Sequence, residues 1–377
     1  MQRVDFIDKI YYLFKVNDVV ALLGPRQCGK TTLSKQYLER YQDTTLYFDL
    51  ENPVDVTRLE QPMLALEDHI GLVVIDEIQL RPDLFPVLRV LVDRKKDCKF
   101  LILGSASRDL IQQSSETLAG RISYIECTPF TLSEIKDSKK LIQRGGFPRS
   151  YLANSLPISF QWRQDYIRTF LERDIPNLGF NIPAKTMRRF WMMLTHYHGQ
   201  NFNASELGKS LGVAHTTVRN YLDILTGTFM VRELQPWHAN INKRQVKSPK
   251  IYFRDTGIYL ALLGIEDDQS LKTHPKLGAI WEGFAMEQII DTHKINSEEC
   301  FFWAVHQQAE LDLLLHLKGK KVGFEFKYQD APKLTKSMLS AMEYLDLDKL
   351  YVIYPGKNPY RLTDKIEVIG LDDYVKK

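Results

Sequence analysis

A glycine-rich segment near the N-terminus narrows the possible folds of this chain more than any other feature. Residues 24–31 read Gly-Pro-Arg-Gln-Cys-Gly-Lys-Thr, which fits G-x-x-x-x-G-K-[ST], and they follow an apolar run at 19–23. The two glycines let the backbone turn so that its N–H groups face phosphate oxygens, while the lysine reaches the β/γ-phosphates and the hydroxyl reaches Mg²⁺. Residues 32–41 are predicted to form a helix, whose N-terminal end favours anions. The sequence therefore predicts a phosphate-binding loop between a strand and a helix.

We expect the residues of this loop and its first neighbour to contact the nucleotide. They are Gly24, Pro25, Arg26, Gln27, Cys28, Gly29, Lys30, Thr31 and Thr32. Lys30 is expected to act in catalysis, and the Thr31 hydroxyl to ligate Mg²⁺. The expected cofactors are therefore ATP and Mg²⁺.

An acidic pair, Asp76-Glu77, supplies the second half of the expected site. It ends an apolar run at 72–75, which is typical of a buried strand. In such a position one carboxylate can hold Mg²⁺ and its neighbour can polarise an attacking water. We expect Asp76 to be the metal carboxylate and Glu77 the catalytic base.

Short apolar strands alternate with helical stretches from residue 17 to about 128, which predicts a parallel α/β sheet. The expected strands are 19–23, 45–50, 72–75, 99–103 and 122–127. Ser105 follows the fourth strand, at the edge where open sheets bind ligands. It is expected to hydrogen-bond the γ-phosphate or the attacking water, with an ordinary small-residue strand exit as the alternative.

Composition and charge indicate a globular protein of two or three domains, because 377 residues exceed one ordinary core. A net charge of +3 is too small to argue for nucleic acid. The four cysteines are far apart, which disfavours a disulfide scaffold and a zinc site and favours a cytoplasmic location. No apolar stretch approaches the roughly 18 residues that a membrane span needs, so no membrane partner is expected.

Four short phrases and their order carry a resemblance to a known family. The phrases are Asp76-Glu-Ile-Gln79, Leu118-Ala-Gly-Arg121, Thr128-Pro-Phe-Thr-Leu-Ser-Glu134 and Gly145-Gly-Phe-Pro148. The order of elements resembles the AAA+ ATPases. The phrases are similar to a widespread prokaryotic family of AAA-type ATPases fused to a C-terminal domain of unknown function. The resemblance runs through essentially the whole chain.

This resemblance implies a homo-oligomeric ring or arc. Arg121 would then stabilise transition-state charge at the nucleotide of a neighbouring subunit, with a surface salt bridge as the alternative. It also implies that the turn at Pro148 opens a lid next to the adenine, and that Arg149 stands where a second sensor would.

A helix-turn-helix pattern follows in the middle of the chain. Residues 203–211 read as a capped helix, 212–213 as a turn and 214–225 as a second helix. The outward positions of the second helix would face a DNA major groove. They are His215, Thr216, Thr217, Arg219 and Asn220.

Two further strands, at 229–234 and 250–253, would complete a winged helix. Between them lie Lys243, Arg244 and Lys247, and no acidic residue occurs from 237 to 250. Such a wing suits contacts with DNA phosphates. Winged helices also serve as protein-docking or packing modules, so that alternative stays open.

The last hundred residues form a run of helix, three strands, helix and strand that resembles the restriction-endonuclease-like PD-(D/E)xK fold. Asp312 stands on one strand, and Glu325 and Lys327 share a face of the next. Asp312 and Glu325 would bind Mg²⁺, and Lys327 would position the water. Glu282 or Glu287 from the helix would complete the metal shell. The alternative is a non-cleaving fold, since Leu311 stands where the motif has proline.

The predicted class is therefore α/β, in four parts. These are a P-loop AAA+ ATPase domain at 1–140, lid or linker helices at 141–180, a winged helix-turn-helix at 181–265 and a nuclease-like domain at 270–377. The first predicted function is an ATP-hydrolysing protein that couples nucleotide state to rearrangement of an oligomer engaged with DNA. The alternatives are a signalling or defence switch that gates the nuclease, and a remodeller of a protein partner without DNA activity.

Overall fold

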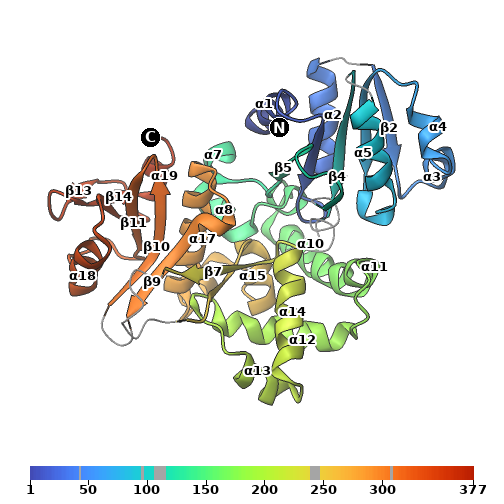
Figure 1. Ribbon diagram of the computed structural model, residues 1–377. Coiled ribbons are helices and arrows are strands. Elements are labelled where there is room, and N and C mark those ends of the chain that lie inside the picture. The colour runs from blue at the N-terminus through green and yellow to red at the C-terminus, as the bar shows by residue number, and fades with distance from the viewer. Residues whose placement is uncertain (42–43, 95–96, 106–115, 238–246, 306–308) are drawn as a thin grey trace. The chain divides into compact units, whose positions relative to one another are not determined.

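The computed structural model describes residues 1–41, 44–94, 97–105, 116–237, 247–305 and 309–377 (Figure 1). The chain divides into two compact units. The first comprises Met1–Pro129 with Gly227–Phe229, and the second comprises Phe130–Thr226 with Met230–Lys377.

The first unit is built on a five-stranded parallel sheet with strand order β2-β3-β4-β1-β5. The strands are β1 (Val19–Leu23), β2 (Thr45–Asp49), β3 (Gly71–Asp76), β4 (Cys98–Gly104) and β5 (Ile122–Glu126). The predicted parallel sheet is confirmed, and each strand bound differs from the prediction by one residue at most. This agreement follows from burial: β1 is apolar throughout because both faces of a parallel sheet are covered.

Helices cover both faces of this sheet. They are α1 (Val4–Leu13), α2 (Lys30–Tyr41), α3 (Pro53–Arg58), α4 (Pro62–Leu66), the 3₁₀ turn η1 (Ile78–Leu80) and α5 (Leu84–Arg94). On one face, α1 and α2 pack against Val20 and Leu22. On the other, α5 and the short helices pack against Val19, Ala21 and Leu23 (Figure 1). Successive β1 side chains thus feed two cores, as strand alternation requires.

The second unit begins with a series of helices, most of which contribute to one apolar core. These helices are α7 (Leu132–Ile135), α8 (Ser138–Arg144), α9 (Pro148–Tyr151), α10 (Leu156–Thr169), η2 (Phe170–Asp174), α11 (Ile175–Asn177), α12 (Ala184–Leu194), η3 (Thr195–Tyr197), α13 (Ala204–Leu211) and α14 (His215–Gly227). The helix-turn-helix spacing is present: Asn203 caps α13 by accepting from Glu206 N at 3.2 Å, and Gly212 ends it with φ 73°. Gly208 allows the close crossing, because a Cβ there would lie 2.8 Å from Val213 O.

Nine strands of the second unit form one mixed sheet with order β13-β14-β12-β11-β10-β9-β7-β8-β6. They are β6 (Gln200–Asn201), β7 (Val231–Pro236), β8 (Lys250–Phe253), β9 (Cys300–Val305), β10 (Ala309–Leu317), β11 (Lys320–Phe326), β12 (Lys349–Tyr354), β13 (Tyr360–Arg361) and β14 (Ile366–Gly370). The accompanying helices are α15 (Thr256–Leu263), α16 (Asp268–Lys272), α17 (Leu277–His293), η4 (Ser297–Glu299), α18 (Lys336–Leu345) and α19 (Leu371–Tyr374).

The junction between β7 and β9 joins the middle of the chain to its C-terminal part. The two strands pair in parallel through Gln235↔Phe301 and Pro236↔Phe302, and Trp237 N donates to Phe302 O at 2.6 Å. The two segments that the sequence suggests as separate domains therefore share one sheet. Helix α17 packs on one face of its C-terminal part and α18 on the other.

Candidate functional site

The glycine-rich loop wraps around its own lysine. Lys30 Nζ is buried and donates to Gly24 O at 2.8 Å and to Pro25 O at 2.9 Å. A Cβ at Gly24 would lie 2.1 Å from Cys127 O, so only glycine lets the loop start this close to the end of β5. Gly29 has φ 103°, a conformation that L side chains rarely adopt. The loop therefore has the tight backbone that its motif predicts.

Asp76 is held by three donors at the end of β3. Thr31 Oγ1 donates to Asp76 Oδ2 at 2.7 Å, Tyr47 OH donates to the same oxygen at 2.9 Å, and Glu77 N donates to Oδ1 at 3.0 Å. Thr31 and Asp76 are the two residues expected at Mg²⁺. Hydroxyl and carboxylate oxygens are the ligands that Mg²⁺ takes beside phosphates, so this donor set fits the ion.

Tyr47 was not predicted from the sequence. Its hydroxyl reaches Asp76 because β2 lies next to β3, and strand order is a non-local property that no short motif reveals. Burial, and then the charge of Asp76, raise the pKa of the Tyr47 phenol. Tyr47 therefore keeps its proton and acts as a fixed donor to the carboxylate.

Glu77 lies beside Asp76 in a left-handed backbone conformation, with φ 57°. Burial raises the pKa of its carboxyl, while the charges of Lys30 and Arg26 act in the opposite direction. Arg26 Nη2 is 3.8 Å from Glu77 Oε2. The Gln79 side chain donates to Glu77 Oε2 and, at 3.0 Å, to Ser105 Oγ. The structure thus brings Lys30, Glu77 and Ser105 to one edge of the sheet.

Cys28, inside the loop, is buried and lies next to Cys127 at the end of β5. Burial opposes ionisation of its thiol, but the hydrogen bond with Cys127 and the charges of Lys30 and Arg3 together lower the pKa. Arg3 Nη1 also donates to Cys127 Sγ at 3.5 Å. The loop's thiol is therefore part of the packing that fixes the loop.

Three further residues are expected at the nucleotide, namely Arg121, Pro148 and Arg149. Arg121 pairs with Asp93 through contacts of 2.6 and 3.2 Å, and its side chain is 37% exposed. Pro148 and Arg149 belong to α9 in the second unit. Their predicted contact with the adenine stays a prediction.

A second group of charged side chains gathers in the second unit, where β10 and β11 pair in the register Leu313↔Phe324. Lys327 Nζ is 2.7 Å from Glu325 Oε2 and 3.9 Å from Asp312 Oδ2. Phe326 N donates to Asp312 Oδ2 at 2.9 Å. Burial, and then the charge of Asp312, raise the pKa of Glu325. The three residues of the expected nuclease motif are therefore neighbours.

Glu282 belongs to this group, and Glu287 does not. Tyr252 OH donates to Glu282 Oε1 at 2.5 Å, and Lys250 Nζ is 3.8 Å from the same oxygen. Burial, and then Asp312, raise the pKa of Glu282. Glu287 is engaged by Arg232 instead, at 2.5 and 2.9 Å. Lys250 and Tyr252, both from β8, are members that sequence reasoning missed, because they come from the strand pair assigned to the wing.

Three family models match successive parts of this chain. A family model described as an AAA domain matches residues 16–136. Two models described as domains of unknown function, DUF8612 and DUF4143, match residues 135–269 and 277–374. Uncharacterized protein Rv2008c of Mycobacterium tuberculosis is 51% identical over 357 residues, which cover 94% of this chain and 80% of that protein. The chain belongs to this AAA-domain family.

A second relative matches with the same sequence identity and coverage, and solved structures match with lower sequence identity. Uncharacterized protein Mb2031c of Mycobacterium bovis matches with the same identity and coverage, 51% over 94% of this chain and 80% of that protein. The Walker-type ATPase PABY2304 of Pyrococcus abyssi is 14% identical, with a TM-score of 0.49, over 70% of this chain and 95% of its own. The RuvB Holliday junction branch migration motor of Thermotoga maritima is 18% identical, with a TM-score of 0.31, over 61% and 89%. The AAA domain at residues 16–136 makes this chain a P-loop ATPase.

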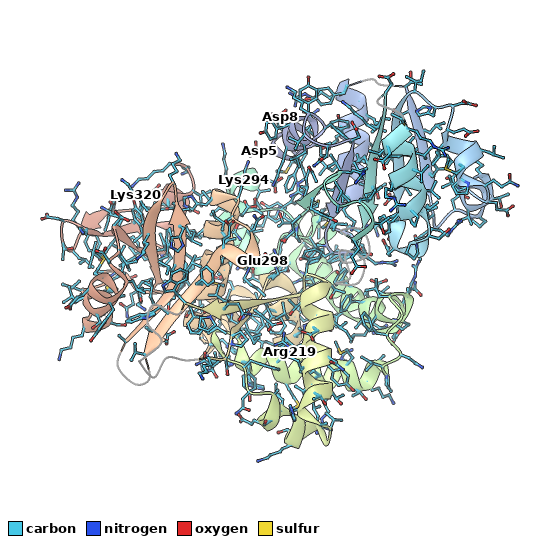
Figure 2. All side chains as sticks on the ribbon, in the orientation of Figure 1. Asp5, Asp8, Arg219, Lys294, Glu298 and Lys320 are labelled. Atoms are coloured by element: carbon cyan, nitrogen blue, oxygen red, sulfur yellow. The ribbon has the colours of Figure 1, made fainter. Side chains whose placement is uncertain are left out.

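The helix-turn-helix of this family member presents a mixed surface. On α14, His215, Thr216 and Asn220 are exposed and Thr217 is half-buried. Arg219 is engaged within the unit: its Nη1 is 2.6 Å from Glu233 Oε2, and its Nη2 is 2.7 Å from Asp223 Oδ1 (Figure 2). Of the expected wing residues, Lys247 is exposed, whereas Lys243 and Arg244 lie outside the described residues.

Two kinds of feature are absent from the part of the chain that the structure describes. No three His, Cys, Asp or Glu side chains in that part of the chain lie close enough together to hold a metal ion. None of its helices combines the length and the apolar character that crossing a membrane requires. The two carboxylates of Asp312 and Glu325 carry hard oxygen donors of the kind that a divalent cation takes, and Lys327 is their present counter-charge.

Proposed function

We propose that this chain hydrolyses ATP and uses its nucleotide state to rearrange an oligomer engaged with DNA. The observation that carries the ATPase half is the 2.7 Å hydrogen bond between Thr31 and Asp76, with Lys30 and Glu77 beside it. The hydroxyl and the carboxylate in this bond are the two groups expected at Mg²⁺, and their proximity supports the proposal. Mg²⁺, when bound with ATP, would neutralise charge on the phosphate oxygens.

The roles of the chain's own residues follow from their contacts. Lys30 holds its ammonium against two loop carbonyls, and a phosphate offers stronger, charged acceptors to the same donor. Glu77, whose pKa is raised by burial, is suited to accept a proton from the attacking water. Ser105 follows the neighbouring strand β4 and offers its hydroxyl to the γ-phosphate or to that water.

The ATPase proposal is tested by separating binding from turnover. Lys30→Ala should abolish binding of a fluorescent ATP analogue, because the ammonium that meets the phosphates is removed. Glu77→Gln should keep binding and lower turnover by about 10²-fold or more, because the proton acceptor is lost. Lys35→Ala, an exposed lysine on the same helix, is the matched control and should change neither. Equal loss of binding in Lys30→Ala and Glu77→Gln would contradict these roles.

The DNA half is supported by the exposed polar side chains of α14. Replacing His215, Thr216 and Asn220 by alanine should weaken binding of a labelled duplex without changing its salt dependence, because these side chains suit base edges. Lys247→Ala should instead reduce the salt slope by about 1, as loss of one phosphate contact does. Lys336→Ala on α18 is the control for general positive charge. If the affinity for the duplex is unchanged in all variants, the alternative function, a remodeller of a protein partner, would be favoured.

As a second function we propose Mg²⁺-dependent cleavage of DNA by the carboxylate group of the C-terminal part. It is favoured by the proximity of Lys327 to Asp312 and Glu325, the two carboxylates expected at the metal. Nicking of a plasmid should require Mg²⁺ and be lost in Glu325→Gln. Glu343→Gln, an exposed change on α18, is the control. If wild-type protein and both variants leave the plasmid intact at every Mg²⁺ concentration, this function is excluded.

A further inference from the structure

The turn after the acidic pair brings a glutamine between two groups of the ATP site. Gln79 lies in η1, two residues beyond Glu77. Its Nε2 donates to Glu77 Oε2 and to Ser105 Oγ, the latter at 3.0 Å. Glu77 follows β3 and Ser105 follows β4, which are neighbours in the sheet. One side-chain amide therefore bridges the ends of two adjacent strands.

The bridge follows from the backbone and from the chemistry of an amide. Glu77 adopts φ 57°, and Leu80 N donates to Glu77 O at 3.0 Å, so the chain folds back over the carboxylate. The NH₂ group of a glutamine carries two donors, which matches the two acceptors that it contacts. The opposite amide orientation would aim Oε1 at the Glu77 carboxylate, where two acceptors would repel.

We infer that Gln79 is a positioning residue for ATP hydrolysis, which fixes the Glu77 carboxylate relative to the Ser105 hydroxyl. The inference rests on the hydrolytic function proposed above and adds a residue to it. In this arrangement a shift of Ser105, on contact with the γ-phosphate or the water, reaches Glu77 through a single amide. Gln79 Oε1 is buried and has no partner among the described residues, so an acceptor is also available beside the carboxylate.

A purely structural bridge and a positioning role differ in what they change. Removing a structural bridge lowers stability and ATP affinity together. Removing a positioning group lowers kcat and leaves KM for ATP nearly unchanged. The separation of kcat from KM therefore distinguishes the two roles.

The test compares wild-type protein with Gln79→Met, which keeps the length of the side chain and removes both donors. We expect kcat to fall by roughly 10-fold, as loss of such supporting contacts often does. KM for ATP should stay within about twofold. Gln61→Met, an exposed glutamine that makes no capping bond at the start of α4, is the control. Gln79→Asn, one methylene too short to bridge, should reproduce the effect if the methionine variant does not fold.

The possible outcomes separate failure of the inference on Gln79 from failure of the proposed ATP hydrolysis. Wild-type hydrolysis that stops in Glu77→Gln but continues unchanged in Gln79→Met and Gln79→Asn would overturn this inference and leave the proposed function intact. A parallel loss of ATP affinity and thermal stability in both Gln79 variants would overturn it too, in favour of a structural bridge. Absence of hydrolysis by the wild-type protein would remove the proposed function itself.

Discussion

The carboxylate of Asp76 shows how much of this ATP site is set by single contacts. Thr31 and Tyr47 donate to the same oxygen, and the backbone of Glu77 donates to the other. If Thr31 ligates Mg²⁺ as proposed, Tyr47 would still donate a hydrogen bond to Asp76. Groups that orient a metal ligand in this way typically change metal affinity by about 10- to 100-fold when they are removed.

Replacing Tyr47 by phenylalanine should therefore weaken the response to Mg²⁺ more than the binding of ATP. We expect the Mg²⁺ concentration that gives half-maximal hydrolysis to rise about 10-fold, with ATP-analogue binding in EDTA unchanged. A titration of hydrolysis with Mg²⁺ measures the shift. Tyr12→Phe, at a tyrosine that is 63% exposed, removes a hydroxyl away from the site and serves as control. An identical Mg²⁺ response in both variants would refute the role given to Tyr47.

Among single residues, the sequence predicts those whose role depends on neighbours a few positions away in the chain. Lys30 and Thr31 belong to one motif, and the acidic pair closes an apolar strand. Glu282 and Glu287 show the limit. Five residues apart on a helix, they point about 140° away from each other, so only one can join the carboxylate group. Buried residues surround α17 on all sides, so its pattern gives no preferred face. Long-range partners make the choice, since Arg232 takes Glu287.

Among the elements, β7 and α17 are joined by that buried ion pair. Arg232 donates to both carboxylate oxygens of Glu287 and to Ser297 Oγ at 2.6 Å. Its side chain is 4% exposed and that of Glu287 is 10% exposed. A buried charge that loses its partner is still desolvated but is no longer compensated. Removing one member of such a pair therefore destabilises the fold strongly.

Arg232→Met should consequently lower the free energy of unfolding of the second unit by roughly 3 kcal/mol, because Glu287 is left buried without its bidentate partner, with Arg254 at 3.6 Å. Urea denaturation followed by tryptophan fluorescence measures the change. Adding Glu287→Met to Arg232→Met should restore part of the loss, because the uncompensated charge disappears. A double variant less stable than the single one would contradict this account.

Strand positions could be predicted far better than strand partners. In the first unit the apolar runs mark each strand, because a parallel sheet buries both faces. In the second unit the same local signals locate β8 to β12, but they do not reveal that β7 pairs with β9. They also miss β13 and β14, since the first is two residues long and both depend on the sheet beside them. Non-local pairing is a property of the assembled sheet, which no window of sequence contains.

At the scale of the whole molecule, Arg121 is the residue expected to act on the nucleotide of a neighbouring subunit. Its pairing with Asp93 involves two exposed side chains, and such pairs contribute little to stability. Arg121 can therefore exchange Asp93 for a phosphate at small cost. This suits the expected role in trans, where an arginine spreads transition-state charge.

Arg121→Ala should lower ATP turnover by about 10³-fold while leaving ATP affinity unchanged. Mixing it with Glu77→Gln should restore activity, because one protein supplies the arginine and the other the base. Asp93→Asn removes only the ion pair and should keep turnover, as should Arg89→Ala, an exposed change on α5. If Asp93→Asn reduces turnover as much as Arg121→Ala does, the arginine acts through its ion pair and not on a neighbour's nucleotide.

The shared edge between β7 and β9 also has a mechanical meaning. A helix-turn-helix joined to the C-terminal part by a flexible linker alone could move independently of it. Here β7, which follows α14 in the chain, pairs with β9, and β9 is followed in the same sheet by β10 and β11, which carry Asp312 and Glu325. A cut in the chain between α15 and α17 should therefore leave two fragments that still associate through the pairing of β7 with β9.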